Sequence, residues 1–154
     1  MAREIIINSP RLNPDYLASR TYQYDQSLVA NKIVGADISP VTHPKAIDLF
    51  AGNGSVARLL SEGEWKEENI VCVDLCQPKN PLVERAQWCY WDLIQLLKAI
   101  SHPESIPEEI SQFRRCFDIV AIAQGPITSS DVEVLGGYFK SKDGVIIPIG
   151  YGIS

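Results

Sequence analysis

Three aspartates, Asp48, Asp74 and Asp92, are the residues whose types and spacing point most directly to chemistry. Asp48 lies inside a short apolar run, and Asp74 and Asp92 come at the ends of two later runs. Such runs predict buried parallel strands. Open α/β sheets bind ligands at the carboxyl ends of their strands, so we expect the three carboxylates to face one binding site.

A glycine turn separates the first of these acids from the second. The segment Ala51-Gly52-Asn53-Gly54 follows the apolar run Ala46–Phe50, and its small residues allow a sharp turn and a close ligand. Val56, Leu59 and Leu60 come next at the spacing of a helix with one apolar face. Strand, turn and helix together predict a nucleotide-binding site, because the first N–H groups of the helix point toward the turn.

Two classes of nucleotide cofactor use this arrangement. Gly52-x-Gly54-x-x-Ala57 fits the pattern G-x-G-x-x-G/A of dinucleotide sites, with Asp74 placed as the acid that binds a ribose. A dinucleotide-dependent enzyme is therefore one possible interpretation of the sequence.

Three other residues favour a different cofactor. A pyrophosphate would be repelled by Asp48, four residues before Gly52, whereas a ligand with a positive centre and an amino group would be attracted by it. Phe50 takes the place where a dinucleotide loop usually has its first glycine. The third acid, Asp92, has no role in the dinucleotide pattern.

The segment Asp48-Leu49-Phe50-Ala51-Gly52-Asn53-Gly54 resembles the first motif of class I S-adenosylmethionine-dependent methyltransferases. Its Phe-x-Gly-x-Gly form is most similar to that of many DNA and RNA methyltransferases. The resemblance covers roughly residues 46–150. It implies that Asp74 binds the ribose hydroxyls, that Asp92 lies near the adenine amine, and that Asp48 holds the methionine amino group directly or through water.

The same resemblance implies a wider set of cofactor-binding residues. Asp92 has a second role open to it, since it could equally be the N-cap of the helix that begins at Leu93. Gln124, after the fourth predicted strand, could bind the acceptor or the methionine amino group through its amide. The implied set is Asp48, Phe50, Ala51, Gly52, Asn53, Gly54, Asp74, Leu75, Asp92, Leu93 and Gln124.

The acceptor motif departs from that of the amine-methylating nucleic-acid enzymes. Where those enzymes carry Asp- or Asn-Pro-Pro-aromatic, this chain has Gln124-Gly125-Pro126-Ile127, which argues against exocyclic-amine chemistry. We therefore expect a methyltransferase for an unknown small-molecule or macromolecular acceptor, with no residue that stands out as a general base. The alternatives are a catalytically inactive methyltransferase-like module that acts through a partner or as an oligomer, and an unliganded structural domain.

The expected fold is a single α/β domain, a Rossmann-like three-layer sandwich around a mostly parallel sheet of order 3-2-1-4-5. Residues 1–44 would form a helical or irregular leader, and residues 45–154 the cofactor-binding core. The two last strands of typical class I methyltransferases are expected to be lacking. The predicted strands are Ala46–Phe50, Asn69–Leu75, Ala86–Trp91, Phe117–Ala123 and Val145–Gly150.

The fifth predicted strand contains Pro148, which lacks the N–H of a ladder bond and so favours an edge position. An open apolar edge invites pairing with another chain. We expect it to be covered by the leader, where Glu4–Asn8 could form a short strand, or by a second copy of the chain in a homo-oligomer.

A helix predicted from Ser130 through Phe139 contains the pair Gly136-Gly137. Each glycine costs roughly 1 kcal/mol relative to alanine inside a helix. Close packing at these positions and an early end of the helix are the two explanations that the sequence offers.

Composition narrows the classes of partner. No apolar run approaches the ~20 residues of a membrane span, and the start of the chain, Met1–Ile7, has too short an apolar stretch for a signal peptide. We therefore expect a cytoplasmic protein without a membrane partner. Residues 46–154 hold nine basic and fifteen acidic side chains, which disfavours nucleic acid as the acceptor. Four cysteines without a C-x-x-C pair, and two histidines each beside a proline, predict no metal site.

Overall fold

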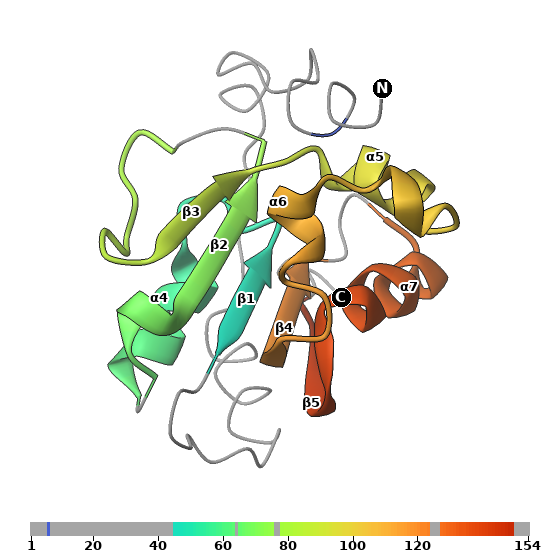
Figure 1. Cartoon of the computed structure of the whole chain (residues 1–154). Coiled ribbons are helices and arrows are strands. Elements are labelled where there is room, and N and C mark those ends of the chain that lie inside the picture. The colour runs from blue at the N-terminus through green and yellow to red at the C-terminus, as the bar shows by residue number, and fades with distance from the viewer. Residues whose placement is uncertain (1–5, 7–44, 64, 76–77, 124–126, 150–154) are drawn as a thin grey trace.

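The structure is a computed structural model, and it describes residues 6, 45–63, 65–75, 78–123 and 127–149. Five strands form one sheet, and helices pack on both of its faces (Figure 1). In chain order the elements are β1 (Ala46–Leu49), α4 (Ser55–Glu62), the short 3-10 helix η1 (Glu67–Asn69), β2 (Ile70–Asp74), β3 (Gln87–Tyr90), α5 (Leu93–Ala99), η2 (Pro103–Ser105), α6 (Glu108–Ser111), β4 (Phe117–Ala123), α7 (Ser129–Phe139) and β5 (Lys140–Ile149).

The strand order is β3-β2-β1-β4-β5 and every pair is parallel, which confirms the predicted order and the α/β class. β1 lies at the centre, with Asp48 opposite Cys72 of β2 and Ala121 of β4. The chain moves outward from β1 to β3 and then returns to β4 on the other side. This reversal of strand order is where α/β sheets form a ligand crevice.

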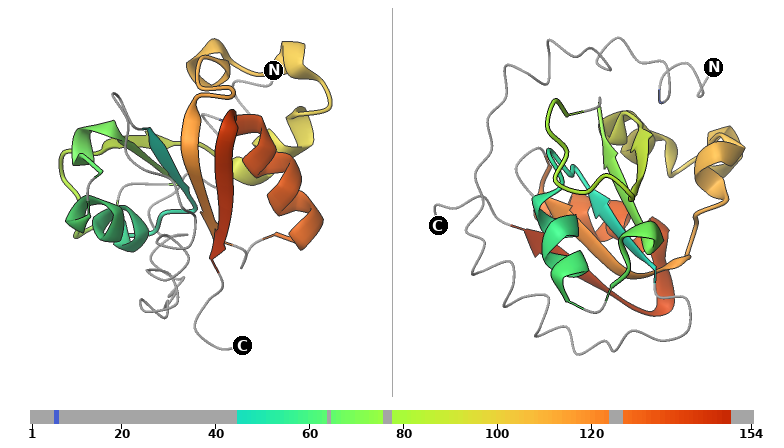
Figure 2. Two further views of the ribbon diagram at one scale, coloured as in Figure 1. Left: turned by 90° about the horizontal axis from the view of Figure 1, so that it is seen from below. Right: turned by 90° about the vertical axis from the view of Figure 1, so that its left-hand side faces the viewer.

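Successive residues of β1 face opposite layers of the molecule. Ile47 and Leu49 join the buried cluster beneath α5, α6 and α7, whereas Ala46 joins the cluster beneath α4. Because side chains alternate along a strand, Asp48 faces the α4 layer. Figure 2 shows the sheet between α4 on one side and α7 on the other, which confirms the three layers.

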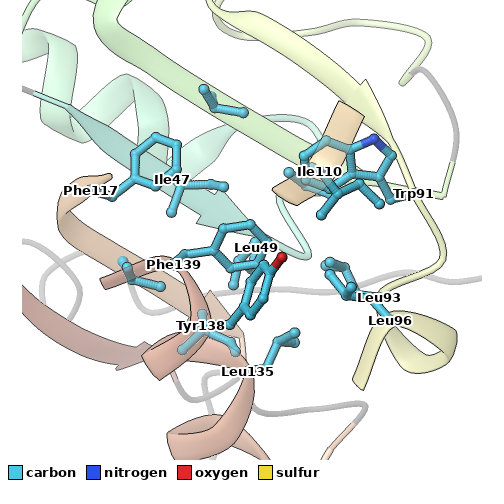
Figure 3. Packing of buried hydrophobic residues seen from close by; sticks show 14 of the residues in the cluster. Ile47, Leu49, Trp91, Leu93, Leu96, Ile110, Phe117, Leu135, Tyr138 and Phe139 are labelled. Atoms are coloured by element: carbon cyan, nitrogen blue, oxygen red, sulfur yellow. The ribbon is translucent and has the colours of Figure 1, made fainter. Parts of the chain in front are cut away.

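Aromatic side chains fill the cluster beneath the three later helices. Phe139 of α7 lies against Leu49 of β1, and Trp91 lies near Ile110 of α6 (Figure 3). The rings of Trp91 and Phe139 are stacked, with centroids 6.2 Å apart. Burial of one such side chain contributes about 1.5–3 kcal/mol, so this cluster is a main source of the stability that holds the sheet in place.

The fifth strand is longer than the sequence predicted. β5 begins at Lys140, which pairs with Phe117, and the pairing then resumes with Val145 opposite Ile119. The predicted strand began at Val145, and this boundary is wrong. The four residues between the two pairings are accommodated as an irregularity of the ladder.

The leader is represented by one described residue, Ile6, which is helical and fully buried. Its carbonyl oxygen accepts a hydrogen bond from the backbone N–H of Asp92 at 2.8 Å, next to the end of β3. β3 and β5 are opposite ends of the sheet order. The prediction that Glu4–Asn8 forms a strand over β5 is therefore wrong at Ile6, and the other residues of that segment lie outside the described ranges.

The pair of glycines in α7 is explained by packing at one position only. A Cβ atom on Gly136 would lie 3.0–3.1 Å from three side-chain atoms of Ile146 in β5, whereas a Cβ on Gly137 would meet nothing within 4 Å. α7 continues to Phe139, so an early helix end is the wrong explanation. The helix also begins earlier than predicted, because Thr128 is its N-cap and accepts the N–H of Asp131.

The difference in space around Gly136 and Gly137 predicts opposite effects on stability when each is replaced by alanine. Gly137→Ala should raise the free energy of unfolding by about 0.5–1 kcal/mol, because alanine loses less conformational entropy in a helix. Gly136→Ala should lower it by about 1–3 kcal/mol, because the added methyl group overpacks the contact with Ile146. Urea denaturation of the two variants beside the wild type measures both values. Equal effects would show that this contact does not limit the position.

Candidate functional site

The turn after β1 has three residues in the left-handed region, Phe50 (φ 60°), Gly52 (φ 60°) and Gly54 (φ 94°). Glycine adopts this conformation without cost, but a bulky side chain does not, so Phe50 stores strain of about 1–3 kcal/mol. The turn is held by the N–H of Ala51, which donates to the carbonyl of Val73 at 2.9 Å. The sequence predicted the glycine positions and gave no sign of the strained Phe50.

The connection between β2 and β3 folds over this turn. A Cβ on Gly54 would lie 3.0 Å from Cγ2 of Val83 and 3.4 Å from the Trp88 ring, so only glycine fits there. The N–H of Leu82 donates to the carbonyl of Asn53 at 2.8 Å, and Nε1 of Trp88 donates to the carbonyl of Val83 at 3.0 Å. Sequence reasoning missed these contacts. The available signal was the apolar pair Leu82-Val83 inside an otherwise polar loop.

Asp74 joins the end of β2 to the turn. Its Oδ2 accepts the N–H of Gly52 at 2.6 Å, and its Oδ1 accepts the N–H of Leu75 at 2.7 Å. Hydrogen bonds from two backbone N–H groups stabilise the ionised form of a carboxylate. The structure therefore brings Asp74, one of the three predicted site acids, into direct contact with the glycine turn.

Asp48 is buried beneath α4 beside the turn. Its side chain is 2% exposed, and its Oδ2 has no hydrogen-bond partner among the described residues. Burial, and to a smaller extent the charge of Asp74, raises the pKa of this carboxyl to about 8, against the opposing effect of a hydrogen bond from the backbone of Ala57. Asp48 is therefore mostly a neutral acid at pH 7, although carboxyl groups in water are ionised at that pH.

Asp92 is the N-cap of α5, which confirms one of its two predicted roles. Its side chain accepts the N–H of Gln95 at 3.3 Å, and the residue is fully buried. The N–H of Trp91 donates to the carbonyl of Asp74, so Asp92 and Asp74 follow neighbouring strand ends. Contact with an adenine amine stays a prediction.

The remaining residues of the predicted set differ in accessibility. Leu75 and Leu93 are buried, at 6% and 2% exposed, so neither offers a side-chain surface in this state. Asn53 is exposed and Gly52 is half-buried, which leaves the main chain of the turn as the accessible part of the site. Gln124 lies outside the described residues.

The described part of the chain was also compared with the requirements of a metal site and of a membrane-spanning helix. No group of three histidine, cysteine or acidic side chains there is arranged to hold a metal ion. None of the helices described is long and apolar enough to cross a membrane.

Comparison of the chain with family models, with curated proteins and with solved structures finds no match. The parallel Rossmann-like sheet and the geometry around the glycine turn are therefore the basis for assigning a function.

The raised pKa of Asp48 predicts how stability depends on pH. A carboxyl group that titrates near 3.9 in the unfolded chain and near 8 in the folded protein is protonated only in the folded state between these values. The folded state then binds more protons, so its stability falls as the pH rises. The contribution of Asp48 to this slope is about 1.4 kcal/mol per pH unit between pH 4 and 8, and it vanishes below pH 4 and above pH 8.

Asp48→Asn should remove this slope, because the amide is neutral at every pH and close in shape to the protonated acid. Urea unfolding of wild type and variant at pH 5, 6, 7 and 8 measures the difference, which should grow in favour of the variant as the pH rises. A constant difference over this range would contradict a buried neutral acid at position 48.

Proposed function

We propose that the chain binds S-adenosylmethionine and is a methyltransferase for an acceptor still to be identified. The observation that carries this proposal is the pair of carboxylates beside the glycine turn. Asp74 holds the N–H of Gly52, and Asp48 lies buried with an oxygen that no described residue satisfies. Two acids next to a turn that approaches its ligand through the main chain suit a ligand with positive charge.

The same acids disfavour a dinucleotide. A pyrophosphate is bound in such sites by the free N–H groups at the start of the helix. Here the N–H of Gly52 already donates to Asp74, and the second carboxyl group lies close by. A pyrophosphate would therefore meet the carboxylate of Asp74 where it needs a free N–H donor. A sulfonium and an ammonium group would instead be attracted to this carboxylate.

Binding of the ribose hydroxyls by Asp74 is part of the same proposal. Asp74 lies at the end of β2 beside the turn, the position from which an acid binds ribose hydroxyls in open parallel sheets. The main chain from Ala51 to Gly54 would lie against the ligand, and its only exposed side chain is that of Asn53.

When bound, S-adenosylmethionine supplies the reactive methyl group. The chain's own contribution would be to orient the ligand against the turn and to place the acceptor in line with it, which can supply much of the rate enhancement by proximity alone. A hydroxyl acceptor would need a base in addition.

A non-catalytic binding module is the second candidate. The specific observation in its favour is the sequence Gln124-Gly125, which stands where the amine-methylating motif has an acidic or amide residue followed by a proline. The two candidates differ in one measurable property, which is transfer of a labelled methyl group from the cofactor to any acceptor in a cell extract.

Calorimetric titration of the purified chain tests the proposed ligand. S-Adenosylmethionine should bind, and Asp74→Ala should weaken it by about 10- to 100-fold, because charge-assisted hydrogen bonds contribute about 1–3 kcal/mol. Asp143→Ala, which removes an exposed acid of β5, is the matched control and should bind as the wild type does. Thermal melting shows whether each variant is folded. Preference for a nicotinamide dinucleotide, or unchanged affinity in Asp74→Ala, would refute the assignment.

A further inference from the structure

We propose that Asp48 is the charge-selecting residue of this site, which holds a proton while no ligand is bound and releases it when a cationic ligand occupies the turn. The inference rests on the proposed function. It adds that the site distinguishes among adenosyl ligands by their positive charge.

The first step is the surroundings of the Asp48 carboxyl group. Oδ2 is buried with no partner among the described residues. From β2 it is faced by Cys72 and Asp74, and from β4 by Ala121. From α4 it is covered at Ala57, whose backbone hydrogen-bonds the carboxyl group.

The second step is that the described protein supplies no cation to this carboxyl group. The buried charged residues described are all acids, namely Asp48, Asp74 and Asp92. On α4 the charged side chains Arg58 and Glu62 are exposed and pair with each other at 3.0 Å. Cys72 adds no charge, because burial raises the pKa of its thiol and keeps it protonated.

The third step is the balance of charge between the two neighbouring acids. The carboxylate of Asp74 is stabilised by two backbone N–H groups, whereas Asp48 has an unsatisfied oxygen. A buried pair of carboxyl groups carries one negative charge more readily than two, so the proton resides on Asp48. Since the described residues offer this group no cation, a proton and a ligand cation would compete to neutralise it.

Binding of a cation is therefore an exchange. The O–H bond of Asp48 breaks, the proton passes to the buffer, and the ligand's positive charge takes its place beside the carboxylate, with no change in oxidation state. A neutral ligand of the same shape gains nothing from this exchange, because it leaves the proton where it is. The site should thus prefer S-adenosylmethionine to uncharged adenosyl compounds.

Calorimetry at pH 7 in two buffers of different ionisation enthalpy counts the protons released. Three probes separate the source of the charge: S-adenosylmethionine has a sulfonium and an ammonium group, S-adenosylhomocysteine has the ammonium group only, and methylthioadenosine has neither. We expect nearly one proton released with the first probe and none with the last. The affinity for S-adenosylmethionine should rise by up to tenfold per pH unit below pH 8 and level off above it.

Asp48→Asn is the test variant and Asp143→Asn the matched control. The ligand's amino group titrates in the same range, near 7.7–8.0, but it does so equally with every variant, so the difference between variants isolates Asp48. Asp48→Asn should lose the excess proton release and the corresponding pH dependence, and Asp143→Asn should keep both. If Asp48→Asn does not fold, the pH dependence of the wild type and the methylthioadenosine arm still decide the question.

Each result has one meaning. Release with S-adenosylmethionine alone supports selection of the sulfonium, and release with S-adenosylhomocysteine as well supports selection of the ammonium group. Binding of S-adenosylmethionine without proton release, or equal release with methylthioadenosine, would overturn the role of Asp48 and leave the proposed function standing. No binding of any probe would overturn the proposed function and this inference with it.

Discussion

The hydrogen bond from the N–H of Gly52 to Asp74 is the interaction on which the arrangement of the site depends. It joins the tip of β2 to the turn that leaves β1, at a distance of 2.6 Å. The second oxygen of Asp74 accepts the N–H of Leu75, so one carboxylate fixes the main chain on two strands. A turn held in this way presents its backbone in one conformation, and a ligand that binds it meets a preorganised surface.

This arrangement has a cost, which is concentrated at Asp48. A carboxyl group in the centre of the sheet, with an unsatisfied oxygen, opposes folding wherever it must be charged. The left-handed Phe50 adds strain two residues later. The apolar clusters on both faces of the sheet offset these costs. Local features that weaken a fold and sit together at the end of a central strand are more often retained for binding than for stability.

The apolar runs were sufficient to locate the five strands, and the resemblance of the first motif implied their order. The sequence also placed Asp74 beside the glycine turn, since both follow strands whose ends meet at one edge. It could not give the helical, buried state of Ile6, which depends on contacts with Asp92 far along the chain. Nor could it give the length of β5, because the pairing of Lys140 with Phe117 depends on tertiary contacts that the local sequence does not reveal.

The connection between β2 and β3 determines how a ligand can reach the turn. Among its described residues it has no helix, and Val83 occupies the space above Gly54 instead. Val83 and Trp88 belong to the cluster beneath α4, so that layer is closed at the turn. Approach is left to the edge of the sheet where Gly52 is half-buried and Asn53 exposed. A ligand entering there meets the main chain of the turn first, with the charged Asp74 and the protonated Asp48 behind it. This order favours selection of the ligand by its charge over selection by side-chain contacts.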